Sequence, residues 1–209
     1  MDENSLTTTE FNIKGFNLRR AVVLRELEQV RLELRRSTSH MRVLDFGCGN
    51  GLMVKALSET GYNVTGVDVD AGQIRKAREI NTDSVIIQSS VFDFNPAETF
   101  DVVVSLEVIE HLYDPQKYLE LCHSHLTPGG FLFLSTPYYG YWKNLMLSIF
   151  GKWDVHHMPL KLHGHIKLFS MRALNDAIGE AGFEVMSIKR LGRVPAFAMM
   201  QFVVARRVR

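Results

Sequence analysis

Cysteine is scarce in this chain, which has only two such residues, Cys48 and Cys122. Two cysteines cannot build a network of disulfides, and they are too few for a cysteine-based zinc site. Cys48 stands inside a glycine-rich segment where a small side chain is needed, and the sequence shows no partner base that would make its thiol a nucleophile. We therefore interpret Cys48 as a packing residue of a binding turn.

The chain also lacks a marked net charge and any long apolar run. Its formal net charge is +1 and its mean hydropathy is −0.03, so nothing favours a nucleic acid or another polyanion as a partner. Basic residues cluster at 31–36 and 206–209, where a solvated face is the simpler interpretation. No apolar run approaches the length of a membrane span, and the polar, acidic first residues do not resemble a signal peptide. The sequence therefore predicts a cytoplasmic protein.

Short apolar runs alternate with helix-like segments along most of the chain. Apolar residues recur at helical spacing in 17–36, whereas residues 1–16 are polar and aperiodic, and we expect those to fray or to cover a site. Strands are expected at 41–46, 62–67, 84–88, 100–106 and 131–135, with helices at 52–60, 70–80 and 115–126. This alternation predicts an α/β fold with a mostly parallel, doubly wound sheet.

The pattern changes at residue 138. Residues 138–169 are rich in aromatic and histidine side chains and have no strand signal. A helix beginning at Ser170 and two strands at 183–190 and 198–205 follow, and their short connection favours an antiparallel final hairpin. We expect one domain, residues 1–209, with an N-terminal helical segment 1–40 and an insertion at 138–169 that covers the site.

A glycine-rich turn, Gly47-x-Gly49-x-Gly51, follows the first expected strand. Glycines allow a ligand to approach the backbone closely, and the N-terminus of the next helix offers unpaired N–H groups. A dinucleotide-binding fingerprint would have its third glycine at position 52, which is Leu52. Asp45, just before the turn, would repel a pyrophosphate but would suit a ligand that carries an ammonium group.

A second acidic residue, Asp68, ends the second expected strand. It stands about 20 residues after the first glycine, where a doubly wound fold places the acid that binds ribose hydroxyls. Asp70 is already suited to cap the next helix, so capping does not require Asp68. We therefore interpret Asp68 as a ribose-binding residue.

With these residues in place, the chain resembles the class I S-adenosylmethionine-dependent methyltransferases over about residues 41–137. Four segments carry the resemblance, in order: VLDFGCGNG at 43–51, VTGVD at 64–68, FDVVVSLEVIEH at 100–111 and LTPGG at 126–130. The resemblance implies a Rossmann-like sheet of seven strands in the order 3-2-1-4-5-7-6, with helices on both faces and the last strand antiparallel.

The resemblance also implies where the cofactor, S-adenosylmethionine, would bind. Asp45 would lie near its ammonium group, Val69 against its adenine, and Leu106 at the end of the fourth strand beside it. Many relatives have an acid after the third strand to bind the adenine amino group, and here Ser90, or the backbone around Val91, would serve instead. The expected cofactor contacts are Asp45, Gly47, Cys48, Gly49, Asp68, Val69, Ser90, Val91, Leu106 and Glu107.

Glu107, Glu110 and His111 end the third of these segments. The chain is similar in particular to the ubiquinone-biosynthesis O-methyltransferases, whose matching residues are associated with a divalent metal. If this segment is helical, the spacing places all three side chains on one face, where Mg²⁺ could bind. Two carboxylates and one histidine are an incomplete shell for a hard cation, so we favour a site without metal in which these residues line the acceptor.

The apolar, aromatic segment 138–153 bears on the acceptor, and two interpretations remain open. The same subfamily has a comparable segment and acts on lipid-tailed phenols, which favours a lid over a hydrophobic acceptor that also touches a membrane surface through 141–153. The alternative is a helix packed on the core or at an interface between two copies, so that the protein is a monomer or a homodimer.

Four histidines, at 156, 157, 163 and 165, follow this segment, and their spacing fits no standard zinc site. Relatives often have a histidine at the place of His165, and an imidazole that titrates near neutral pH suits removal of a hydroxyl proton. We nominate His165 as the general base, with His111 as its rival, and expect Glu110 to be the third catalytic residue facing the acceptor. A structural role is the simpler interpretation of each histidine taken alone.

We therefore predict an S-adenosylmethionine-dependent methyltransferase that acts on a small molecule, in particular on a hydroxyl oxygen of a hydrophobic or phenolic metabolite. Transfer to nitrogen or carbon of another metabolite is an alternative, because the fold alone does not decide the acceptor. A protein that binds the cofactor without catalysis is another.

Overall fold

A computed structural model of the chain describes residues 3–154 and 164–208, with side chains described from residue 14 onward. Seven strands form one sheet in the order β3-β2-β1-β4-β5-β7-β6, and only β7 runs antiparallel to its neighbours. The predicted fold class and strand order are therefore confirmed. The strands are β1 (Arg42–Phe46), β2 (Asn63–Asp68), β3 (Val85–Gln88), β4 (Phe100–Leu106), β5 (Leu126–Pro137), β6 (Phe183–Leu191) and β7 (Met200–Arg207).

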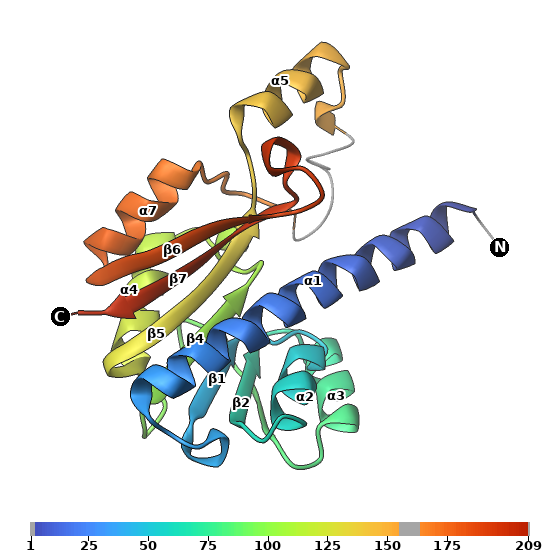
Figure 1. Cartoon of the computed structure of the whole chain (residues 1–209). Coiled ribbons are helices and arrows are strands. Elements are labelled where there is room, and N and C mark those ends of the chain that lie inside the picture. The colour runs from blue at the N-terminus through green and yellow to red at the C-terminus, as the bar shows by residue number, and fades with distance from the viewer. Residues whose placement is uncertain (1–2, 155–163, 209) are drawn as a thin grey trace.

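Helices cover both faces of this sheet (Figure 1). The helices α1 (Glu3–Leu34), α2 (Leu52–Ser58) and α3 (Ala71–Ile80) share one apolar core with the sheet. The other core lies beneath α4 (Pro115–His125) and α7 (Met171–Glu180). Because β4 is buried on both faces, its continuous apolar run is what a central parallel strand requires.

Local turn chemistry explains why most helix ends fall where the sequence predicts them. The Asp70 carboxylate accepts a hydrogen bond from the backbone N–H of Gln73 at 2.9 Å and so caps α3, and Ser170 caps α7 in the same way. Gly61 and Gly182 follow α2 and α7 with φ values of +90°, a left-handed conformation that ends helices at little cost in glycine.

Two boundaries differ from the expectation. Helix α1 begins at Glu3 and not near residue 17, so residues 3–16 are helical and do not fray. Residues 3–16 contain no proline. A helix that is stabilised by the apolar stripe of 17–36 can therefore continue through them toward the N-terminus, although they have no apolar periodicity themselves. Strand β5 begins at Leu126 and includes the expected turn 127–130, with Gly129 at φ +76° and a register shift against β4.

The insertion contains the helix α5 (Tyr141–Ile149), which projects from the carboxyl end of β5 away from the rest of the fold (Figure 1). Within the described part of the chain none of its side chains is buried, and it packs against the short 3-10 turn Pro195–Phe197. The helix is therefore half-buried at 143–147 and contributes no fully buried side chain to the core of the described residues, whereas Tyr138 and Tyr139 before it are buried. Three of the four histidines considered above, at 156, 157 and 163, lie outside the described residues.

Among the described residues, no helix has both the length and the apolar character needed to cross a membrane.

Candidate active site

The glycine turn after β1 combines two different requirements. A Cβ atom at Gly47, where φ is +96°, would overlap the side chain of Val108 in the loop after β4. A Cβ at Gly49 would meet nothing within 4 Å, so this glycine borders open space. Gly47 is therefore needed for packing, and Gly49 lies where a ligand can approach the backbone.

The third glycine, Gly51, serves the packing of α2 on α3. A Cβ there would lie 2.5 Å from Nδ2 of Asn81 and 2.8 Å from Cβ of Ala77. The same Asn81 amide donates hydrogen bonds to the carbonyl oxygens of Gly51 and Ala77, at 3.1 and 2.8 Å. The glycine spacing thus reflects helix packing as well as ligand binding, which the sequence did not reveal.

Asp68 is tied directly to the glycine turn. Its carboxylate accepts hydrogen bonds from the backbone N–H groups of Gly49 at 2.8 Å and Asp70 at 2.9 Å. An ionised carboxylate has about four lone-pair sites, so it retains the capacity to accept two ribose hydroxyls. The residue therefore holds the turn in shape in addition to its predicted role, and the Gly49 contact could not be anticipated from the sequence.

Asp45 is a buried carboxylate, with 2% of its surface exposed. Its Oδ2 atom has no hydrogen-bond partner among the described residues. Burial, and to a smaller extent the charge of Asp68, raise the pKa of Asp45 to about 7. An unpaired buried acid beside an open turn is costly unless a cationic group binds there, so these residues fit the ammonium group of S-adenosylmethionine.

The expected adenine side is only partly built from side chains. Val69 follows β2 and is 66% exposed, which leaves its surface available to a ring. The Ser90 hydroxyl accepts a hydrogen bond from the N–H of Phe92 at 3.2 Å, so its first role is to shape the turn. The side chain of Val91 is buried in the core beneath α4, so only its backbone can contribute.

Leu106 ends β4 and packs against the core beneath α1, and Cys48 is also part of that core. Burial raises the pKa of the Cys48 thiol, which keeps the thiol protonated and agrees with its interpretation as a packing residue.

Glu107 is turned away from the group in which we expected it. Its backbone has a φ of +57°, and its carboxylate accepts a hydrogen bond from the Ser135 hydroxyl on β5 at 2.7 Å. The expected helix that would place Glu107, Glu110 and His111 on one face does not form; a 3-10 turn covers only Ile109–His111. A left-handed residue interrupts the helical path, so the sequence spacing does not apply.

Glu110 lies at the centre of the site and is fully buried. Neither carboxylate oxygen makes a hydrogen bond of normal geometry with the described residues, although the Thr136 hydroxyl is close enough to lower the carboxyl pKa in part. Burial, and then the charge of Glu107, raise the pKa of Glu110 well above its usual range. His111 is its nearest ionisable partner in the turn, with Nε2 at 3.9 Å from Oε1.

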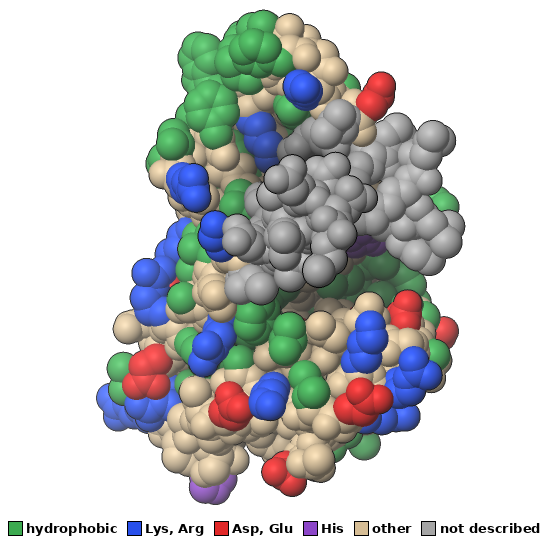
Figure 2. Space-filling view, turned by 90° about the vertical axis from the view of Figure 1, so that its right-hand side faces the viewer, with side chains coloured by type: hydrophobic (Ala, Val, Ile, Leu, Met, Phe, Trp, Pro, Cys, Tyr) green, Lys and Arg blue, Asp and Glu red, His purple; other side chains and the backbone are tan. Residues whose placement is uncertain are grey.

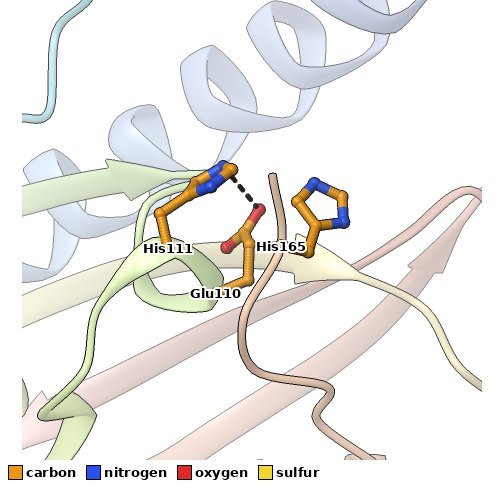
Figure 3. A group of neighbouring side chains, drawn as sticks. All are labelled: Glu110, His111 and His165. Atoms are coloured by element: carbon orange, nitrogen blue, oxygen red, sulfur yellow. Dashed lines mark ion pairs between the residues drawn. The ribbon is translucent and has the colours of Figure 1, made fainter. Parts of the chain in front are cut away.

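His165 completes the group in place of Glu107. One ligand atom each of Glu110, His111 and His165 lie within 4.8 Å of one another, and the two imidazole ring centroids are 5.0 Å apart. Figure 3 shows the Glu110 carboxylate between the two histidine rings. The structure thus brings together the three residues nominated for proton transfer.

Backbone hydrogen bonds hold the segment that carries His165 in this position. The carbonyl oxygen of Glu110 accepts from the N–H groups of Ile166 and Lys167, at 2.9 and 3.0 Å. Nδ1 of His111 lies 3.2 Å from the carbonyl oxygen of Gly164, 53 residues along the chain; a carbonyl can only accept, so Nδ1 carries the proton and donates. These long-range contacts explain why sequence spacing could not predict the group.

Sequence reasoning missed Tyr139, Ser135 and Thr136. All three are buried at the carboxyl end of β5 or directly after it, and the Tyr139 hydroxyl lies 3.1 Å from Nδ1 of His165. Ligand sites of parallel sheets form at the carboxyl ends of the strands, and that rule, applied to β5, would have pointed to these residues.

Comparison with known proteins identifies the family to which the chain belongs. A family model described as "Methyltransferase domain" matches residues 18–188. The chain is 32% identical over 154 residues to the ubiquinone biosynthesis O-methyltransferase of Pseudomonas aeruginosa (strain UCBPP-PA14), covering 70% of this chain and 66% of that protein. It is 33% identical over 159 residues to the protein of the same name from Cereibacter sphaeroides, covering 71% and 62%. The match therefore spans slightly less than two thirds of these relatives.

Among solved structures, the fold is similar to the magnesium protoporphyrin IX methyltransferase of Synechocystis PCC 6803 with bound SAH. The TM-score is 0.65 at 16% identity, and the match covers 98% of this chain and 100% of that one.

Proposed function

We propose that this chain, which belongs to the methyltransferase-domain family and is an S-adenosylmethionine-dependent methyltransferase, methylates a hydroxyl oxygen of a hydrophobic or phenolic small molecule. The observation that carries this proposal is the group Glu110, His111 and His165, of which the first two follow Val108, the residue that lies against Gly47 of the glycine turn. An O–H nucleophile must lose a proton as it attacks, and a cluster of one buried carboxylate and two partly exposed imidazoles is suited to accept it. The similarity to relatives named O-methyltransferases supports the same acceptor atom.

S-adenosylmethionine supplies a methyl group bound to positively charged sulfur, which is already activated for displacement. Asp45 would hold its ammonium group, and Asp68 would accept hydrogen bonds from its ribose. Gly49 would let the backbone pass close to it. The remaining task of the protein is to align the acceptor oxygen, and such positioning is worth about 7–11 kcal/mol of barrier.

His165 would take the acceptor proton, with Glu110 beneath it to stabilise the imidazolium that results. Because the pKa of Glu110 is raised by burial, an adjacent cation would favour its ionised form. His111 donates from Nδ1 to Gly164, so only its Nε2 could serve as the rival base.

A divalent metal bound by Glu110, His111 and His165 is the alternative. Two imidazoles and one carboxylate suit Zn²⁺ or Mn²⁺ better than Mg²⁺, which prefers oxygen ligands. Loss of methyl transfer on chelation, with recovery on addition of one of these ions, would favour the metal; unchanged transfer in excess chelator would favour proton transfer by His165.

The acceptor's hydrophobic character is inferred from α5 and its surroundings. Large apolar side chains are exposed here, and Figure 2 shows them as a green group at the top of the molecule, near Lys and Arg side chains. They are Tyr141, Trp142, Ile149, Phe150, Trp153, Val194 and Phe197. Exposed aromatic residues with nearby positive charges are typical of segments that contact a membrane surface. We therefore propose peripheral contact with an anionic bilayer, from which a lipid-tailed acceptor could enter.

Vesicle co-sedimentation tests this contact. Binding to phosphatidylglycerol vesicles should weaken in Trp142→Ser and persist in Tyr113→Ser, a variant of an aromatic residue that is more exposed (86% against 58%) and distant in sequence. Loss of dimerisation in Trp142→Ser without any vesicle binding would instead assign this surface to a second copy.

Calorimetry and a methyl-transfer assay test the function itself. S-adenosylhomocysteine should bind at micromolar concentration and NADH should not compete, whereas Asp68→Asn should weaken binding about tenfold or more because a charged acceptor of hydrogen bonds is lost. Radioactive methyl from S-adenosylmethionine should appear on a catechol with an alkyl chain. Transfer only to amine or carbon acceptors would refute O-methylation, and binding without transfer to any acceptor would leave a cofactor-binding protein.

A further inference from the structure

Tyr139 is a buried phenol that lies directly beside the proposed base. It follows β5, is 8% exposed, and its hydroxyl oxygen is 3.1 Å from Nδ1 of His165. Its backbone carbonyl accepts a hydrogen bond from the Asn144 side chain at 3.3 Å, and Nζ of Lys143 lies 5.7 Å from its ring centroid. The start of α5 therefore helps to hold Tyr139 in place beside His165.

The two nitrogens of an imidazole lie on different edges of the ring, and a contact to one decides what the other can do. In Figure 3 the ring of His165 stands beside Glu110, with one nitrogen turned away from that carboxylate. When His165 takes a proton both nitrogens become donors, so Nδ1–H then requires an acceptor. The Tyr139 oxygen is at hydrogen-bond distance for this role.

We propose that Tyr139 is a positioning residue for His165: its hydroxyl oxygen accepts from Nδ1–H and directs Nε2 to the acceptor hydroxyl. The proposal rests on the proposed function, because it assumes that His165 takes the proton. The proton passes from the acceptor oxygen to Nε2 as the oxygen–methyl bond forms and the sulfur–methyl bond breaks. Tyr139 itself keeps its proton.

The surroundings of Tyr139 agree with a neutral phenol. Burial, followed by the charges of Glu110 and Glu107, raises the pKa of Tyr139 to about 12. A neutral hydroxyl can accept from the imidazolium without competing for its proton, in the way that a backbone carbonyl or carboxylate orients a histidine in other sites.

The neighbouring Tyr138 provides a matched control. It is also 8% exposed, and its ring lies 6.0 Å from the guanidinium carbon of Arg190 and not at His165. Tyr138→Phe and Tyr139→Phe therefore each remove one hydroxyl from an equally buried tyrosine, and only the second removes the contact to His165. Both variants should bind S-adenosylhomocysteine as the unmodified protein does, which checks that the fold is retained.

The first readout is the pair of ¹⁵N shifts of the His165 ring, assigned by their disappearance in His165→Gln. The unmodified protein and Tyr138→Phe should show a protonated Nδ1 and an unprotonated Nε2. Tyr139→Phe should move both shifts toward a mixture of tautomers. Unchanged shifts in Tyr139→Phe would overturn the proposal, whether or not any acceptor is methylated.

The second readout is the rate of methyl transfer to the alkylated catechol. Tyr139→Phe should lower kcat about 10- to 100-fold, a part of the ~100- to 10,000-fold that general base catalysis supplies, with KM nearly unchanged. Equal kcat values in the two tyrosine variants would also overturn the proposal. If no acceptor is methylated, the proposed function fails, and the ¹⁵N shifts still decide whether Tyr139 positions His165.

Discussion

Replacing Asp45 by Asn should stabilise the empty protein and at the same time weaken cofactor binding. Asp45 is 2% exposed, and its Oδ2 has no partner among the described residues. Asparagine has nearly the same shape and avoids the burial of a charge. The two effects should have opposite signs because the charge that is costly in the empty protein is the one that binds the ammonium group.

The size of the stability effect follows from the pKa of Asp45. The rise from 3.8 to about 7 corresponds to at most about 4 kcal/mol, at about 1.36 kcal/mol per pKa unit. Because the pKa is higher in the folded protein, the folded protein binds the proton of the Asp45 carboxyl group more tightly than the unfolded chain does. Stability from the protonated acid is therefore complete below pH 3.8 and is lost as the pH rises to about 7.

Guanidinium denaturation of the empty protein at two pH values tests this sign. Asp45→Asn should raise the free energy of unfolding by up to about 4 kcal/mol at pH 8, and by less than about half of that at pH 5. Asp83→Asn, which changes an exposed acid, should have no comparable effect at either pH and serves as the control.

Calorimetry with S-adenosylhomocysteine tests the second effect. Loss of a hydrogen-bonded charge partner should weaken binding by about 1.5–3 kcal/mol, which is about 10- to 150-fold. If the stability gain of Asp45→Asn does not grow with pH, Asp45 is not a buried, unpaired charge in the empty protein. Unchanged affinity would refute the role of Asp45 as the ammonium partner.

Two further substitutions test the packing around the site. Gly47→Ala should destabilise the protein by about 1–3 kcal/mol in a denaturation experiment, because the added Cβ overlaps Val108. Val108→Ala in the same chain should restore part of the stability, and an unchanged stability in Gly47→Ala would contradict the close approach of these two residues. Tyr118→Phe should reduce stability by about 1–3 kcal/mol, since its hydroxyl hydrogen-bonds to Phe46 O at 3.2 Å and Ser105 Oγ at 2.8 Å; a thermal melt unchanged from the parent protein would argue against these bonds.

The arrangement of the glycine turn and Asp68, where we expect the cofactor to bind, could be predicted from the sequence. The signals there are local: a buried strand, a glycine turn and an acid at the end of the next strand, each in a fixed relation to its own element. Asp68 and the glycine turn meet because β1 and β2 pair in parallel with Phe46 opposite Val67. Parallel pairing of consecutive strands brings their carboxyl ends together in any fold of this type.

The acceptor side could not be predicted in the same way. The expected group of Glu107, Glu110 and His111 assumed a helix, but Glu107 has a φ of +57° and its side chain turns to Ser135. A single residue in the left-handed region changes the direction of every side chain after it. Such a conformation is set by packing between β4 and β5, and no periodic pattern records it.

Sequence alone determined the sheet, its order through the resemblance, and the antiparallel final hairpin, and it marked the two acids that we expect to bind the cofactor, because periodicity, turn residues and strand ends are encoded within a few residues. Tertiary structure decided that His165 joins Glu110 and His111, that Tyr139 contacts His165, and that α5 is exposed. The physical reason is distance along the chain. Hydrogen bonds from Ile166 and Lys167 to Glu110 form only when the completed sheet brings the segment after the insertion back across the end of β4.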